Sequence, residues 1–258
     1  MDAYTGFAAL YDTFMDNIPY KEWSDYVINL LKQHNINDGI VLDLGCGTGN
    51  ITEYLATAGY DMIGIDYSED MLNIAQEKKY DNGLDILYLN QDMREFELYG
   101  TVSAIISICD SMNYITEFDD LVKVFKLVNN YLDPKGLFIF DLNTIYKYTQ
   151  MGDTVIAENR PEGSFIWENT YFDDKRINQY DLTIFSRIPD DELDIEDQGK
   201  LFEKFEETHL QKAYTLDEIK LALSNAGMEF ITAYDAFSND PIKDTSERIY
   251  IIARESGK

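Results

Sequence analysis

Apolar residues recur along this chain with helical spacing in some segments and with strand-like spacing in others. Within residues 1–36, Phe7, Leu10, Tyr11 and Phe14 fall on one face of a helix. A second helical pattern runs from Trp23 to Leu31, beyond Pro19. We therefore expect the chain to begin with a helical segment.

From residue 40 onward, short apolar runs alternate with helical patterns. The predicted strands are Ile40–Leu44, Met62–Ile65, Ile86–Leu89, Val102–Ile108 and Leu137–Phe140. The predicted helices lie around Ile51–Ala58, Glu69–Lys79 and Leu121–Leu132, with Ser68 as an N-cap and a turn at 133–136. Strands separated by helices imply right-handed crossovers and hence a parallel, doubly wound sheet.

The pattern changes after Leu142. Residues 154–188 and 200–211 alternate apolar and polar positions, which is typical of antiparallel strands, and an acidic run at 189–194 predicts an exposed loop between them. At Thr215–Glu218 a capping box opens a helix that ends near Gly227. The final strands are expected at Phe230–Tyr234 and Arg248–Ala253.

The predicted fold class is therefore α/β, with a doubly wound, mostly parallel seven-stranded sheet and an inserted antiparallel β lid. One domain comprises residues 1–149 and 212–258, with 1–36 as an N-terminal helical cap. The lid comprises residues 150–211.

The composition restricts the partners. Of 258 residues, 45% are hydrophobic and 14% aromatic, as in a globular protein. The chain has 48 acidic against 21 basic residues, a net charge of −27, which argues against a general grip on nucleic-acid phosphates. It shows neither a signal peptide nor an apolar run of about 20 residues. The two cysteines form no CxxC pair, which argues against a disulfide or a metal site. We expect a cytoplasmic monomer or homodimer that binds no membrane and no metal.

A glycine-rich turn is the first candidate for chemistry. Val41–Asn50 reads VLDLGCGTGN, with glycines at 45, 47 and 49, and Asp66 ends the next predicted strand. Glycine allows a backbone to turn tightly beside a ligand, and a carboxylate at the next strand end can accept both hydroxyls of a ribose. The dinucleotide fingerprint has a third glycine where this chain has Asn50, so a nicotinamide cofactor is disfavoured. Two alternatives remain open: the glycine-rich turn could be purely structural, and Asp66 could cap the following helix.

Polar residues also follow the other strands. Asp92-Met93 follows the third predicted strand, and Cys109–Tyr114 the fourth. Ligands of open α/β sheets bind at the carboxyl ends of the strands, where these residues would form a row.

The quoted segments resemble class I S-adenosylmethionine-dependent methyltransferases over nearly the whole chain. VLDLGCGTGN resembles their first motif, GIDYSEDML the second and NQDMREF the third, while CDSMNYI resembles the fourth-strand segment of small-molecule and sugar-amine N-methyltransferases. The resemblance implies a Rossmann-like fold, S-adenosylmethionine as methyl donor, S-adenosylhomocysteine as product, and no metal.

The resemblance also implies roles for individual residues. Asp43 and the Cys109 carbonyl would hold the ammonium group of the donor, Asp66 the ribose hydroxyls, and Asp92 the adenine amine. The full implied set of cofactor contacts is Asp43, Gly45, Cys46, Gly47, Asp66, Tyr67, Asp92, Met93, Cys109, Asp110 and Tyr20. Asp92 could instead be a turn residue, and both cysteines could simply be packed side chains.

The methyl acceptor is expected to be a small molecule, and nucleic acid an improbable partner. Its candidate contacts are Tyr4, Tyr11, Ser111, Tyr114 and His209, of which Tyr11, Tyr114 and His209 are candidates for catalysis. A general base is needed only if the nucleophile must lose a proton. The alternatives to acceptor contact are structural: His209 could lie on a strand surface, and the tyrosines could pack in the core. An RNA or protein methyltransferase, or a cofactor-binding regulatory protein without turnover, remains the functional alternative.

Overall fold

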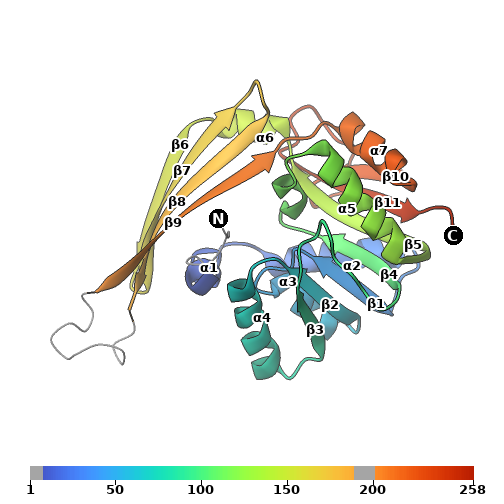
Figure 1. Cartoon of the computed structure of the whole chain (residues 1–258), viewed down its shortest axis with the longest axis horizontal. Helices are drawn as coiled ribbons and strands as arrows, with labels where there is room; N and C mark the ends of the chain where they lie inside the picture. The colour runs from blue at the N-terminus through green and yellow to red at the C-terminus, as the bar shows by residue number, and fades with distance from the viewer. Residues whose placement is uncertain (1–7, 189–200) are drawn as a thin grey trace.

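Two β-sheets organise the protein in this computed structural model, which describes residues 8–188 and 201–258 (Figure 1). Tyr4, Phe7 and the acidic run predicted as a loop at 189–194 lie outside the described residues. No helix in the described ranges is both long enough and apolar enough to cross a bilayer.

The larger sheet has seven strands in the order β10-β11-β5-β4-β1-β2-β3. The strands are β1 (Ile40–Leu44), β2 (Asp61–Asp66), β3 (Ile86–Asn90), β4 (Val102–Ser107), β5 (Leu132–Asn143), β10 (Met228–Asp235) and β11 (Arg248–Glu255). The first five pair in parallel, while β11 is antiparallel to both β5 and β10. The predicted doubly wound, mostly parallel sheet is thus confirmed.

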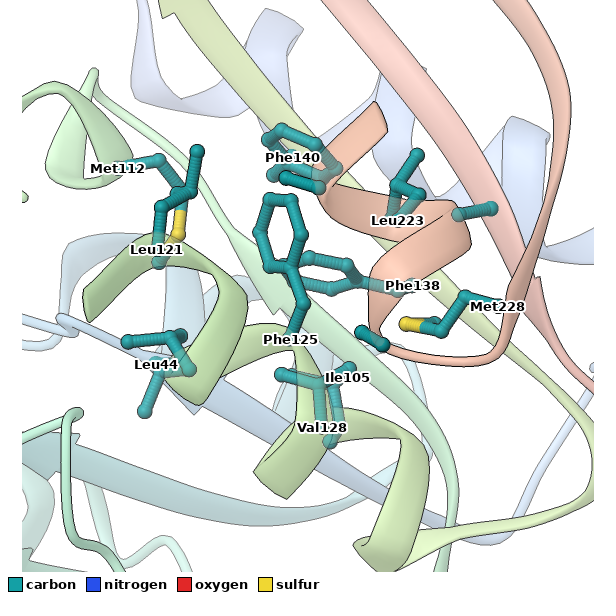
Figure 2. Close-up of a cluster of buried hydrophobic side chains, with 14 of the residues drawn as sticks. Leu44, Ile105, Met112, Leu121, Phe125, Val128, Phe138, Phe140, Leu223 and Met228 are labelled. Carbon is teal, nitrogen blue, oxygen red and sulfur yellow. The ribbon is translucent and has the colours of Figure 1, made fainter. Parts of the chain in front are cut away.

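Helices cover both faces of this sheet. Successive side chains of a strand point to opposite faces, and apolar side chains on both faces pack against helices. On β5, Phe138 and Phe140 pack into the cluster that includes α5 (Phe118–Tyr131) and α7 (Leu216–Asn225), as Figure 2 shows. Ile139 packs into the opposite cluster. That cluster includes α2 (Tyr20–Gln33), α3 (Asn50–Thr57) and α4 (Glu69–Asn82).

Two local features differ from the prediction. The turn predicted at 133–136 lies inside β5, where the pairing with β4 shifts register between Val102 and Ala104 and Lys135 has a φ of +66°. A seven-residue helix, α6 (Ile145–Met151), was not predicted. Its N-cap is Thr144, whose side chain accepts a hydrogen bond from the Lys147 amide.

The smaller sheet is antiparallel, in the order β6-β7-β8-β9. Its strands are β6 (Thr154–Arg160), β7 (Gly163–Phe172), β8 (Ile177–Arg187) and β9 (Phe202–Lys212). We call this sheet the lid; it projects from the body at the upper left of Figure 1. Leu10 and Phe14 of α1 (Ala8–Phe14) and Tyr148 of α6 pack against its inner face.

A buried asparagine fixes the lid to the body. The Asn113 amide nitrogen donates to the carbonyls of Asn143 (3.1 Å) and Lys212 (2.8 Å), and its oxygen accepts from the Asn143 amide (3.0 Å). These bonds join the fourth-strand segment, the end of β5 and the end of β9. The lid therefore leaves and re-enters the body beside the carboxyl ends of the strands.

Candidate active site

The glycine-rich turn is held against β2 by its own backbone. The amides of Gly45 and Cys46 donate to the Ile65 carbonyl at 2.8 and 3.0 Å. Gly45, Gly47 and Gly49 all have positive φ, a conformation that residues with a Cβ rarely adopt. A Cβ added to Gly47 would meet no protein atom within 4 Å, so free space adjoins the turn.

That space is a cavity of about 410 Å³ at the carboxyl ends of β1, β2, β3 and β4; we call it the first cavity. It is lined by all but one of the residues predicted to contact a cofactor: Tyr20, Asp43, Gly45, Cys46, Gly47, Asp66, Tyr67, Asp92, Met93 and Cys109. Asp110 is the exception. The first cavity is also lined by Tyr11, Ser111 and Tyr114, which were predicted as acceptor contacts.

Asp66 is oriented by backbone amides. One carboxylate oxygen accepts from the Gly47 amide at 2.8 Å and the other from the Ser68 amide at 2.9 Å. Ser68, as predicted, is the N-cap of α4, so Asp66 is not needed for that task. Burial raises the pKa of Asp66, and the two amides oppose the shift. Each oxygen retains a further lone pair for a ligand.

Asp43 is a second carboxylate beside the turn. It is 2% exposed and accepts a hydrogen bond from the Thr52 hydroxyl at 2.6 Å. Burial raises its pKa to about 7, the Thr52 hydrogen bond opposes the shift only in part, and the nearby charge of Asp66 adds to it. Within the described residues, neither Asp43 nor Asp66 forms an ion pair. Two unpaired carboxylates beside free space suit a ligand with an ammonium group and ribose hydroxyls, as S-adenosylmethionine has.

Asp92 has a partner within the chain. Its carboxylate accepts from the Arg94 amide at 2.8 Å and from the Arg94 guanidinium at 3.0 Å. Burial raises the pKa of Asp92, but the bonds from Arg94 outweigh it and the net shift is downward. Within the chain, Asp92 therefore behaves as the turn residue that was the alternative interpretation. Its proposed hydrogen bond to the adenine amine of the donor stays a prediction.

The end of β4 has an unusual backbone. Cys109 and Asp110 both have positive φ, at +66° and +54°, and their amides both donate to the buried Asp141 carboxylate on β5, at 3.3 and 2.7 Å. Arg248 of β11 binds Asp141 at 2.5 Å and Asp110 at 2.6 Å. Burial raises the pKa of the Cys109 thiol, so this cysteine is a neutral packed residue. The strained backbone is held by a buried ion pair that sequence spacing did not reveal.

A second cavity of about 280 Å³ lies under the lid. It shares Tyr11, Tyr20, Cys109 and Tyr114 with the first cavity, and Asp110 faces this one instead. Aromatic residues of α2 and of the lid also line it, namely Trp23, Trp167 and Tyr180. Burial raises the pKa values of Tyr11 and Tyr20, which share a hydrogen bond, so both phenols stay protonated at neutral pH.

His209 lies in the second cavity beside Tyr114. The Tyr114 hydroxyl is 3.4 Å from His209 Nδ1, and His209 Nε2 is 3.0 Å from a carboxylate oxygen of Glu207. The side chains of His209 and Glu207 are only 2% and 4% exposed. The structure thus brings together two of the predicted catalytic candidates and adds Glu207, which the sequence analysis missed. Its signal was its place two residues before His209, on the same face of the strand.

Asp12 also contributes to the site, although no sequence motif indicates it. Its carboxylate accepts from the Thr48 hydroxyl (2.7 Å), the Asn50 amide (2.8 Å) and the Lys78 ammonium (3.1 Å). Since Asp12 lies on α1, these bonds hold α1 against the glycine-rich turn. They also give Asn50 a structural role.

Comparison with known proteins identifies the family. The model of a methyltransferase domain family matches residues 41–136. YqeM of Bacillus subtilis (strain 168), which carries a provisional methyltransferase name, is 32% identical over 98% of this chain and 97% of its own length. An S-adenosylmethionine-dependent methyltransferase from Clostridium acetobutylicum ATCC 824 is 31% identical, with a TM-score of 0.84 over 99% of this chain and 100% of its own. The fold is also that of S-adenosylmethionine-bound CalS10, an amino pentose methyltransferase from Micromonospora echinaspora, with a TM-score of 0.71, 16% identity, and coverage of 99% of each chain. The chain belongs to the S-adenosylmethionine-dependent methyltransferases.

Proposed function

We propose that this enzyme methylates a small molecule bound in the second cavity, with the donor in the first. The observation that carries the proposal is that the two cavities share the wall formed by Tyr11, Tyr20, Cys109 and Tyr114. Methyl transfer between the two cavities would take place beside these shared residues. A cavity of about 280 Å³, lined by the lid and α1, suits a small acceptor.

The donor would be held by the residues beside the glycine-rich turn. Asp66 offers two oriented oxygens to the ribose hydroxyls, and Asp43 offers a carboxylate to the ammonium group. S-adenosylmethionine supplies a methyl group on a sulfonium, which is already activated for attack. The protein therefore has to align the nucleophile and exclude water, and alignment alone can supply a large part of the acceleration.

Tyr114 and His209 are proposed to handle the proton of the acceptor. In the neutral tautomer with the proton on Nε2, His209 donates a hydrogen bond from Nε2 to the Glu207 carboxylate. Its Nδ1 can then accept a hydrogen bond from the Tyr114 hydroxyl. A nucleophile that touches the Tyr114 oxygen can then pass a proton toward Nδ1. Glu207 would be a positioning residue that stabilises the charged imidazole.

A small-molecule acceptor is favoured over RNA by the charge of the chain and by the size of the second cavity. The net charge of −27 opposes a polyanion. CalS10, described as an amino pentose methyltransferase, has the same fold, which supports the proposal of a small acceptor. A protein acceptor would have to insert a side chain into a cavity of about 280 Å³ between the lid and α1.

Donor binding is tested by thermal shift. We expect S-adenosylmethionine and S-adenosylhomocysteine to raise the Tm, and NAD to leave it unchanged. Asp66→Ala should abolish the shift, whereas the exposed Asp61→Ala should retain it. The absence of a shift with either sulfur ligand in the native protein would contradict donor binding.

The class of acceptor is tested with methyl-labelled donor in a cell extract divided into small-molecule, RNA and protein fractions. We expect label in the small-molecule fraction, dependent on Asp66. Label in RNA or protein, or measurable affinity for tRNA at physiological salt, would overturn the small-molecule proposal.

A further inference from the structure

Helix α6 brings an ammonium group to the second cavity. Lys147 lines this cavity and is partly buried, and its Nζ donates to the Asn143 side-chain oxygen at 2.8 Å. The backbone of Lys147 is fixed as well, because its amide donates a hydrogen bond to the side chain of the N-cap residue Thr144. A lysine held in this way is part of the cavity wall.

The other cation that lines the second cavity already has counter-charges, because Arg248 binds both Asp110 and Asp141. Lys147 differs: among the described residues no carboxylate lies within 4.0 Å of its ammonium. An ammonium has three donors, of which the described contacts use one.

This arrangement is unfavourable in the absence of a ligand. Burial lowers the pKa of Lys147, and the positive charge of Arg248 adds to that effect, while Asp110, Asp141 and Glu247 oppose it from a greater distance. A cation taken partly out of water is costly unless an anion pairs with it. In the second cavity, the Lys147 ammonium therefore has two N–H donors with no partner among the described residues.

We propose that Lys147 binds an anionic group of the methyl acceptor, a carboxylate or a phosphate, and that the acceptor is a planar acid. This inference rests on the proposed function and names its substrate class. Trp167 and Tyr180 of the lid and Trp23 of α2 supply flat apolar walls for a ring. A cavity of about 150 Å³ is enough for benzene, so 280 Å³ admits a single-ring acid with substituents.

The charge of the whole chain makes such a subsite necessary for an anionic acceptor. With a net charge of −27, the surface repels anions. A local cation must then supply the attraction that the overall field lacks. The competing explanation is that Lys147 only offsets the charges of Asp110 and Asp141 at a distance. In that case its removal would change stability but leave ligand preference unaltered.

The test uses the full chain saturated with S-adenosylhomocysteine, so that the first cavity is occupied. Binding of benzoate, phenyl phosphate and the uncharged benzamide is measured by calorimetry or ligand-observed NMR. We expect one of the two anions to bind at least roughly tenfold more tightly than benzamide, a difference of about 1.4 kcal/mol. The tighter anion identifies the acidic group.

Three variants decide the role of Lys147. Lys147→Met should remove the preference for the anion while retaining benzamide binding, and Lys147→Arg should restore it. Lys126→Met, at an exposed position on α5, should behave as the native protein. Equal affinity for anions and benzamide, binding of neither at millimolar concentration, or an unchanged preference in Lys147→Met would overturn the proposal. Failure of S-adenosylhomocysteine to bind would instead refute the proposed function.

Discussion

Replacing Asp43 by asparagine should stabilise the protein without a ligand at neutral and alkaline pH, although it removes a hydrogen-bonded residue. Asp43 is 2% exposed, and burial raises its pKa from 3.8 to about 7. A carboxyl whose pKa is higher in the folded state favours folding while it is protonated. That advantage is lost as the pH rises from the unfolded value, near 4, through the folded value, near 7.

The size of the effect follows from the pKa difference. Each pKa unit corresponds to about 1.4 kcal/mol, so ionising Asp43 costs the folded state up to about 4 kcal/mol at pH 8. Asparagine keeps the shape and can still accept the Thr52 hydrogen bond, but it carries no charge. The stability of Asp43→Asn relative to the native protein should therefore improve by about 2–4 kcal/mol between pH 5 and pH 8.

The assay is urea denaturation of the native protein, of Asp43→Asn and of Asp61→Asn at pH 5 and pH 8, without cofactor. Other carboxyls titrate in the same way in all three proteins and cancel in the comparison. The exposed Asp61→Asn should show no such pH dependence. A difference between Asp43→Asn and the native protein that is equal at both pH values would refute the reasoning. Donor affinity provides the complementary readout: it should rise from pH 6 to pH 8 in the native protein, and this rise should be smaller in the variant.

Three further variants test the supports of the site. Glu218→Gln should destabilise the protein by about 1–2 kcal/mol at pH 7. Arg176 lowers the pKa of Glu218 to about 2, and the stability that the pair contributes above pH 4.5 is lost as the pH falls toward 2; equal acid-denaturation curves would count against this. Arg248→Met should cost about 3–5 kcal/mol in urea denaturation, because it leaves buried carboxylates unpaired. Adding Asp141→Asn should recover part of the loss, and no recovery would mean that charge is not the cause. Asp12→Ala should weaken S-adenosylhomocysteine binding several-fold in calorimetry by releasing α1 from the glycine-rich turn, and unchanged affinity would show that α1 does not support the first cavity.

The cofactor side of the site was readable from the sequence because its signals are local. A strand, a glycine-rich turn and a helix follow one another within Val41–Thr57, and Asp66 ends the next strand. Each of these steps depends on residues close in the chain, such as the N-cap Ser68. Parallel pairing then brings the strand ends together without further information.

The second cavity was predicted only in part. Tyr11, Tyr114 and His209 were predicted as acceptor contacts and line it, but its charged residues meet only after folding. Asp141 and Arg248 are separated by 107 positions, and a carboxylate inside the apolar run FIFDLN gave the only hint of a buried partner. Helix α6 has seven residues, too few for a periodic pattern, and short helices depend on tertiary packing. Lys147 therefore appeared in no prediction, although Thr144 was a detectable N-cap.

Asp110 lies at the junction of two parts of the protein that move as separate units in many enzymes with lids. Its amide is fixed by Asp141, and its carboxylate accepts from Gln211 of the lid strand β9 at 2.7 Å. The backbone at the floor of the first cavity and the position of β9 are thus parts of one hydrogen-bonded unit. An acceptor that holds β9 in place should therefore raise the affinity for the donor next to Cys109. By thermodynamic reciprocity, the donor must raise the affinity for the acceptor by the same factor. We expect donor and acceptor to bind with positive cooperativity, so that release of one product lowers the affinity for the other.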